Sequence, residues 1–168
     1  MRIMGVDPGT VIMGWGVIDS NDGELSLVDY GALKCPSRLA TAERLGFLYI
    51  KLYEIVTKYR PDAVAIEQPF VSENVKSALA IGKAQAVAIL AAVNNSVSTF
   101  EYTPAKIKRQ IANYGTSSKE QIQEMVRLEL HMKEPPEPAD AADALAVALC
   151  HVQEVHLSNL LSERTRGS

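Results

Sequence analysis

The sequence of 168 residues has only two cysteines, few aromatic side chains and no long hydrophobic run. Cys35 and Cys150 are far apart and fit no metal-binding or redox spacing, so we expect free thiols in a reducing compartment. No apolar run reaches the roughly 18–20 residues that cross a membrane, and no secretory signal precedes the first predicted strand. We find no internal repeat or low-complexity tract. These absences favour a cytoplasmic globular protein with no membrane partner.

The length and the 47% hydrophobic content are those of one domain with a substantial core. We expect a single domain over residues 1–157, followed by a polar, disordered tail over residues 158–168. The net charge is −3, but the segment from residue 74 to residue 119 contains a single acid, Glu101. Its basic residues are Lys76, Lys83, Lys106, Lys108, Arg109 and Lys119. A basic binding face and a chance fluctuation explain this segment about equally well.

The first half of the chain predicts three strands, a long helix and a fourth strand. Apolar segments at residues 2–7, 13–18 and 24–33, with an Asn-Asp-Gly turn before the third, predict an antiparallel meander. Ser37 is the expected N-cap of an amphipathic helix that ends before Pro61. The short apolar run at residues 63–66 ends on Glu67 and predicts a buried strand parallel to the first.

The second half predicts more helices around one further strand. A helix rich in small residues is expected at residues 73–93, a fifth strand at 97–102 and a short helix from Pro104. Ser117 or Ser118 should cap a helix that runs to about residue 132, and a last helix is expected from about 138 to 155. The predicted fold class is α/β. Its five-stranded mixed sheet combines the antiparallel meander with parallel strands, and helices flank both faces.

Four carboxylates occupy positions that could bring them together. Asp7 and Glu67 each end an apolar strand, and parallel neighbours end at the same edge of a sheet. Asp140 and Asp143 lie three apart at the start of the last helix, on one face. Each acid has an ordinary explanation, as a turn aspartate, a strand-end acid or a partner of the helix dipole. As a group they would repel one another without a cation, which favours a site for Mg²⁺ or Mn²⁺. Two such ions could hydrolyse a phosphodiester.

Three motifs at these positions carry a family resemblance. They are G-V-D-P-G-T with G-W-G-V-I, then A-I-E-Q-P-F, and finally D-A-A-D-A-L-A-V-A-L-C-H. Together they resemble the RuvC Holliday junction resolvases of the RNase H-like superfamily, in order and spacing, up to about residue 155. The resemblance implies an RNase H-like fold and a homodimer that binds a four-way DNA junction during recombination and repair. It also implies paired, metal-dependent nicks that leave 5′-phosphate and 3′-hydroxyl ends.

The resemblance assigns roles residue by residue. The implied ligands of Mg²⁺, with Mn²⁺ as substitute and two ions per site, are Asp7, Glu67, Asp140 and Asp143. Lys108 and Lys119 match basic residues near the scissile phosphate, and Lys119 would steady its developing charge. Phe70 matches an aromatic that stacks on bases at the junction centre. The other expected DNA contacts are Asn74, Lys76, Ser77, Lys83, Lys106 and Arg109. A branch-migration motor is a partner implied by the family alone.

Some positions depart from the family pattern. Gln85 stands where an arginine is usual, so Lys83 would have to supply that charge. Trp15 and Cys150 replace a usual tyrosine and threonine, which we interpret as packing changes. We expect His151 to be a buried or helix-end histidine outside the ligand set.

Three other functions compete with the resolvase. A sugar-kinase or actin-like ATPase shares the Asp-x-Gly-Thr loop, but it needs two such domains, and this chain has the length of one. A non-catalytic junction-binding module would need the basic face without the acids. Another RNase H-like nuclease, acting on RNA/DNA hybrids or transposon ends, is excluded only by the motifs.

Overall fold

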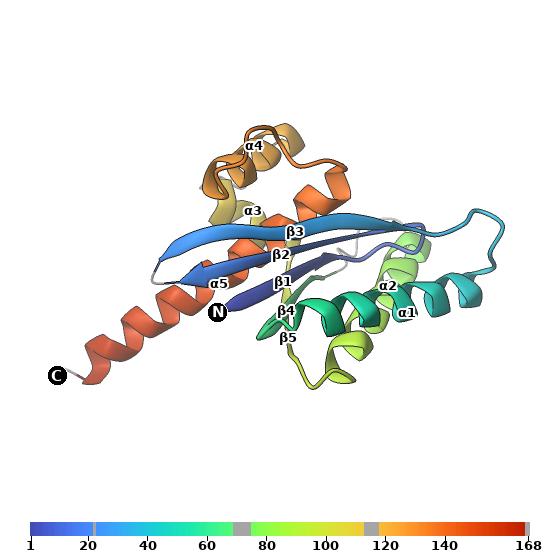
Figure 1. The fold of residues 1–168 in the computed structure, drawn as a ribbon, viewed down its shortest axis with the longest axis horizontal. Coiled ribbons are helices and arrows are strands. Elements are labelled where there is room, and N and C mark those ends of the chain that lie inside the picture. Colours follow the sequence, from blue (N-terminus) through green and yellow to red (C-terminus); the bar gives the residue numbers. More distant parts are fainter. Residues whose placement is uncertain (22, 69–74, 113–117, 167–168) are drawn as a thin grey trace.

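The computed structural model describes residues 1–21, 23–68, 75–112 and 118–166 (Figure 1). It has one five-stranded sheet in the order β3-β2-β1-β4-β5. The strands are β1 (Arg2–Asp7), β2 (Ile12–Asn21), β3 (Glu24–Lys34), β4 (Ala63–Glu67) and β5 (Ser98–Tyr102). The first three strands pair antiparallel, whereas β4 runs parallel to β1 and β5 parallel to β4. The predicted mixed sheet is therefore confirmed.

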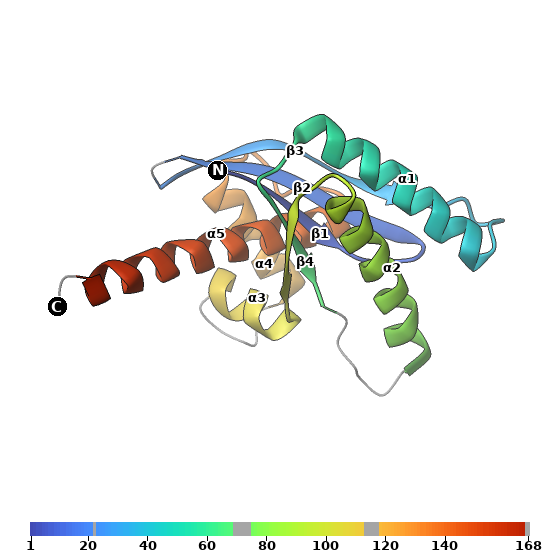
Figure 2. The same ribbon diagram turned by 90° about the horizontal axis from the view of Figure 1, so that it is seen from below.

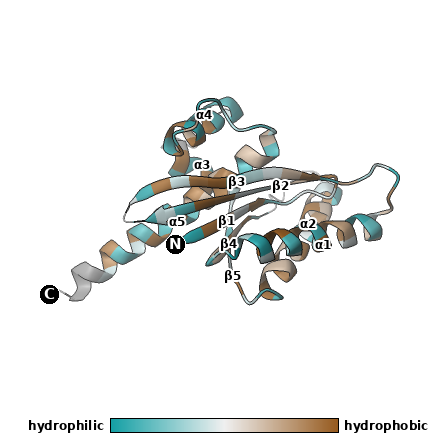
Figure 3. Cartoon of the chain, in the orientation of Figure 1, coloured by the Kyte–Doolittle hydropathy of each residue, from teal (hydrophilic) through white to brown (hydrophobic). Residues whose placement is uncertain are grey.

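Helices cover both faces of this sheet (Figure 2). They are α1 (Thr41–Tyr59), α2 (Val75–Val93), α3 (Pro104–Ala112), α4 (Lys119–Glu129) and α5 (Ala139–Arg166). Side chains alternate along the buried strands, so that Ile3 joins the core beneath α3, α4 and α5 while Met4 joins the core beneath α1 and α2. The hydropathy colouring shows the apolar strands enclosed between these two layers (Figure 3).

Glycines in β1 and β2 let α5 lie unusually close to the sheet. A β-carbon on Gly5 would overlap the carbonyl oxygen of Ala144, and one on Gly14 would overlap that of Asp140. The helix is also lined with small buried residues, such as Ala141 and Ala148. The absence of a β-carbon at these two glycines permits this approach of the helix backbone to the sheet. The start of α5 is thus held against the centre of the sheet.

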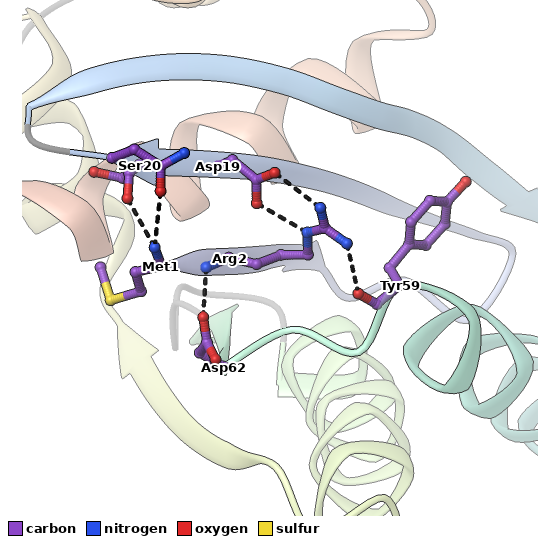
Figure 4. A network of polar contacts seen from close by, with 7 residues as sticks. Met1, Arg2, Asp19, Ser20, Tyr59 and Asp62 are labelled. Atoms are coloured by element: carbon purple, nitrogen blue, oxygen red, sulfur yellow. Dashed lines mark hydrogen bonds and ion pairs between the residues drawn. The ribbon is translucent and has the colours of Figure 1, made fainter.

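A polar network joins the amino end of β1 to the carboxyl end of β2 and to the residues before β4 (Figure 4). The guanidinium of Arg2 donates two hydrogen bonds to the Asp19 carboxylate, each 2.8 Å long, and a third to the Tyr59 carbonyl. The backbone N–H of Arg2 donates to Asp62 at 2.6 Å. These bonds tie β1 to β2 and to the end of α1, at the edge opposite the carboxyl ends of β1 and β4.

The start of α1 differs from the prediction. The helix begins at Thr41 rather than after Ser37, because Glu43 accepts a hydrogen bond from the backbone N–H of Ala40 at 2.8 Å. Arg44 also donates to the carbonyls of Leu39 and Ser37, which holds the preceding residues in a turn. Ser37 is therefore not the N-cap.

Two helix ends were also predicted wrongly. α4 ends at Glu129, short of residue 132, because His131 adopts a left-handed conformation (φ 51°) and the Met132 N–H closes onto the carbonyl of Arg127. α5 continues to Arg166 instead of ending near residue 155, and its last turns project from the body (Figure 1). No proline or glycine interrupts the sequence before Gly167, so nothing stops the helix earlier.

Among the residues that the structure describes, two helices have the length and mean hydropathy of a membrane span, although no such segment was expected. They are Val75–Val93 and Ala139–Ser162. The prediction considered uninterrupted apolar runs, whereas a window average tolerates a few polar residues. Residues from both helices contribute to the two cores, as core helices of this composition do.

Candidate active site

The carboxyl ends of β1 and β4 bring the first two acids together. The two strands pair in parallel with Val6 opposite Ile66, so Asp7 and Glu67 lie side by side where these neighbouring strands end. Both side chains are half-buried. The predicted proximity of these two carboxylates is thus confirmed by the register.

The start of α5 lies across the same edge. Gly14 of β2 is the antiparallel partner of Asp7, and Asp140 packs directly over Gly14. Asp143, one turn further along, faces the pocket that Asp7 and Glu67 line. All four acids therefore gather at one place, with Asp140 at its border.

The first residue of α4 supplies a cation to this cluster. The Nζ of Lys119 lies 3.2 Å from an Asp143 carboxylate oxygen, although 73% of the lysine side chain is exposed. Ser118 caps the helix, since its hydroxyl accepts from the Gln121 N–H while Gln121 accepts from the Ser118 N–H. A lysine at a helix N-terminus is disfavoured by the helix dipole. Lys119 is tolerated there because it faces carboxylates.

A second lysine and an apolar wall complete what we call the carboxylate pocket. Its volume is about 260 Å³. It is lined by Asp7, Glu67, Pro104, Ile107, Lys108, Lys119, Ile122, Asp143 and Ala146. Thr103 caps α3 through a 3.2 Å bond to the Lys106 N–H, and Pro104 is the first helical residue, as predicted. The two lysines can bind an anion, and the acids beside them can bind cations, so both kinds of ligand can occupy this pocket together.

The protonation of the acids reflects their crowding. Burial, and then the charges of Glu67, Asp143 and Asp140, raise the pKa of Asp7 to about 8. The pKa of Glu67 is also raised, first by burial and then by Asp143, while a hydrogen bond with Asp7 and the two lysines act in the opposite direction. Raised pKa values at these strand ends mean that the neighbouring lysines do not neutralise the negative charge of the acids.

The donor set fits a divalent cation of the hard type. Carboxylate oxygens are what Mg²⁺ and Mn²⁺ prefer, and a bound cation would relieve the repulsion that raises the Asp7 pKa. Within the described parts of the chain, however, no three acidic, histidine or cysteine side chains are arranged as a finished metal cage. Lys119 pairs with Asp143 instead. The chemistry of the side chains suits the metal, although the acids are not arranged around one common position in this structure.

Two predicted DNA contacts lie away from this pocket. Lys106 forms an ion pair with Glu154 of α5, with 2.9 Å between Nζ and the carboxylate oxygen. Arg109 lines a separate pocket, beside Met1 and His156. Both residues share a short helix with Lys108, but they occupy different faces of it. Sequence proximity to Lys108 was a poor guide to their surroundings.

The remaining expected contacts belong to α2 and the segment before it. Lys76, Ser77 and Lys83 are exposed on α2. Phe70 and Asn74 lie outside the described residues. Gln85, at the position of a usual arginine, donates a 2.6 Å hydrogen bond to Glu101 on β5 and so ties α2 to the sheet.

The structure reveals contributors that the sequence reasoning missed. Gly5 and Gly14 allow α5 to approach, and Ile107 and Ile122 form the apolar wall of the pocket. The glycines of β2 and the alanines of α5 were visible as small-residue stripes, but nothing in the sequence paired them. His151 matches its prediction: it is 2% exposed, and its Nδ1 lies 2.7 Å from the Tyr102 hydroxyl.

The fold is that of an RNase H-like nuclease, and acids from two strand ends and a crossing helix gather at one end of its sheet. Comparison with known proteins identifies one family within this class. The family model for the crossover junction endodeoxyribonuclease RuvC matches residues 3–151. A protein of that name from Dehalococcoides mccartyi is 54% identical over 163 residues, covering 97% of this chain and 99% of the relative. The chain belongs to the RuvC family of crossover junction endodeoxyribonucleases, which are metal-dependent nucleases.

Solved structures agree with this assignment. The Thermus thermophilus RuvC structure has a TM-score of 0.85 at 31% identity, over 94% of this chain and 97% of that one. The same protein in complex with a Holliday junction substrate gives a TM-score of 0.88 at 31% identity, over 94% and 96%. The yeast mitochondrial Holliday junction resolvase shares the fold, with a TM-score of 0.65 at 12% identity, over 96% and 85%.

Proposed function

We propose that the chain resolves four-way DNA junctions by hydrolysing two phosphodiesters at the carboxylate pocket, in recombination and repair. The observation that carries this proposal is the group of crowded acids with two lysines beside them at one edge of the sheet. The lysines do not balance the negative charge of the acids, which leaves room for bound cations. Lys108 and Lys119 come from α3 and α4, where they can bind the phosphate group beside metal ions. The Thermus thermophilus complex with its Holliday junction supports the choice of substrate.

In this proposal Asp7, Glu67, Asp140 and Asp143 hold the metal, as Mg²⁺ or Mn²⁺ with two ions per site. Bound there, the ions would activate water and stabilise the leaving oxygen. The residues of the chain hold the phosphate in place. Lys119 exchanges its partner Asp143 for a phosphate oxygen, and Lys108 binds the phosphate from α3. The expected ends are a 5′-phosphate and a 3′-hydroxyl.

The rest of the proposed DNA face extends along α2. Lys76, Ser77 and Lys83 would contact the DNA backbone, as would Asn74, and Phe70 would stack on bases. Gln85 contributes no charge, so the exposed Lys83, two residues earlier in the chain, would supply it. Lys106 and Arg109 do not contact the DNA in this proposal, because their side chains face other surfaces.

The proposal also includes the cellular setting and the domain boundary. An enzyme of DNA recombination with two buried free thiols fits the cytoplasm. The catalytic domain is taken as residues 1–157, and the later residues continue α5 beyond it. A branch-migration motor remains a partner implied by the family.

A substrate panel tests the function. A synthetic four-way junction, a linear duplex and an RNA/DNA hybrid are each incubated with Mg²⁺ or with EDTA, and the products are resolved on denaturing gels. We expect two symmetrically placed nicks in the junction, none with EDTA, and products that a DNA ligase reseals. Equal cutting of the duplex or the hybrid would contradict junction specificity and favour another RNase H-like nuclease.

We further propose that the active form is a homodimer joined through α2. The face of α2 turned away from the sheet has an exposed apolar stripe: Val75, Leu79, Ala86, Leu90 and Val93. A continuous apolar stripe on a helix favours burial against a partner. A two-fold pair would present one pocket to each of the two related phosphates of a junction. Ala84 and Ala88, on the opposite face, are fully buried within the protomer, so a bulky residue there would test folding rather than dimerisation.

Leu90→Glu tests this interface. Leu90 is 53% exposed, so the substitution should leave the protomer folded and turn the dimer into a monomer, as measured by light scattering. Paired nicking should then fall sharply. Leu128→Glu on α4 is the control, because Leu128 is similarly exposed at 49% but lies outside the stripe. A Leu90→Glu protein that is still dimeric would refute the proposed interface.

A further inference from the structure

Glu154 of α5 holds two side chains of α3 with one carboxylate. One of its oxygens lies 2.9 Å from the Lys106 Nζ, and the other accepts a hydrogen bond from the Gln110 Nε2 at 3.1 Å. Lys106 and Gln110 are four residues apart, so they share one face of α3. The carboxylate therefore spans about one turn of that helix.

A second layer of contacts lies behind the same face. The Cys150 thiol donates to the side-chain carbonyl of Gln110. The Lys106 ammonium lies 5.2 Å from the centre of the Tyr102 ring, and the Tyr102 hydroxyl hydrogen-bonds to buried His151. This face of α3 is thus joined to both β5 and α5.

The other faces of α3 serve the pocket and the core. Ile107 and Ile111 are 5% and 3% exposed and anchor the helix in the core. Lys108 lines the carboxylate pocket, where its charge partly opposes the rise in the pKa of Glu67. A helix of nine residues has little stability of its own, so its contacts determine its orientation. A rotation of α3 that loosens one face must move Lys108 on another.

We propose that Glu154 is a positioning residue of the nuclease: by clamping Lys106 and Gln110 it fixes the rotation of α3 and so the position of Lys108. This inference rests on the proposed function, since it assumes that Lys108 binds the scissile phosphate. It also gives Lys106 a different role, because its ammonium completes the clamp and does not reach DNA.

Single-turnover cleavage of a four-way junction tests the clamp in the full chain. We expect Glu154→Ala to lower the cleavage rate about tenfold, since small misplacements of a group that binds substrate are costly, and to leave junction affinity within about twofold. Glu54→Ala is the matched control. It removes an ion pair of similar exposure on α1, between Glu54 and Lys51, and should change neither value.

A second background separates positioning from general destabilisation. In a Lys108→Ala protein the clamp has nothing to position, so adding Glu154→Ala should change the rate by less than about twofold. A full tenfold loss in that background, or no loss in the wild-type background, would overturn the clamp. If Lys108→Ala alone cut as fast as wild type, the proposed role of Lys108 would fail, and the clamp would fail with it. Failure of wild type to cut the junction would refute the proposed function.

The salt dependence of junction binding, measured in EDTA, tests the role of Lys106. A lysine that contacts phosphate contributes about one unit to the slope of log affinity against log salt. Lys108→Ala should reduce the slope by about that amount, whereas Lys106→Met should leave it unchanged. A reduced slope for Lys106→Met would show that Lys106 contacts DNA, and the clamp would lose one of its two partners.

Discussion

Replacing Asp7 by asparagine is expected to abolish cleavage and, at the same time, to stabilise the metal-free protein. Asp7 ends the central strand and faces Glu67, Asp143 and Asp140. Asparagine keeps the shape but loses one anionic ligand, so junction cleavage should fall by about a thousandfold or more. Junction binding should persist, because the lysines are untouched.

The stability gain follows from the raised pKa of Asp7. Because its pKa is about 8 in the folded protein, against about 3.9 for an ordinary aspartate, the native state binds this proton more tightly than the unfolded state. Stability is therefore lost as the pH rises from about 4 to 8. Asp7→Asn removes that loss, so the variant's gain in unfolding free energy is near zero at about pH 4 and grows to as much as roughly 5 kcal/mol at pH 8.

Urea unfolding in EDTA at pH 5 and at pH 8, together with a junction cleavage assay, measures both effects. Asp19→Asn is the matched control at the opposite end of the sheet (Figure 4). Hydrogen bonds from Arg2 lower the pKa of Asp19, so its loss should destabilise the protein while cleavage continues. An Asp7→Asn protein that cuts the junction, or that unfolds more easily at pH 8, would contradict the assignment of this pocket.

Adding a single methyl group at Gly14 is expected to damage both the fold and the site. Its β-carbon would overlap the backbone carbonyl of Asp140. Backbone cannot rotate away as a side chain can, so α5 must lift from β2. We expect the free energy of unfolding to fall by about 3 kcal/mol or more, near the upper end of the cost of overpacking a core. Cleavage should fall even where the protein remains folded, because Asp140 and Asp143 move away from Asp7.

Gly46→Ala provides the control for this substitution. Gly46 lies in α1, and an added β-carbon there would meet nothing within 4 Å. Alanine in a helix is favoured over glycine by roughly 0.8–1.0 kcal/mol, so this variant should be more stable and fully active. Thermal unfolding and single-turnover cleavage of the two variants check the prediction. A stable, active Gly14→Ala protein would show that the close approach of α5 is not required.

The strands and the acids were predictable because their signals are local. Apolar runs that end in Asp7 and Glu67 mark strand ends, and a parallel crossover makes those ends neighbours. Pro104 and Ser118 mark the starts of α3 and α4 through chemistry contained within one turn. Ser37 misled the prediction for the opposite reason, since the helix start was decided by Glu43 reaching back to the Ala40 backbone.

The sequence by itself determined the element order and the places of the acids at two strand ends and at the start of the last helix, because each depends on residues close together in the chain. Only the tertiary structure decided what those residues face. It paired Gly14 with Asp140, turned Lys108 toward the carboxylates and turned Lys106 toward Glu154. Lys106 and Lys108 are two positions apart and both basic, so no local pattern separates them. Their surroundings differ because a helix rotates about 100° per residue, and only packing fixes where that rotation begins.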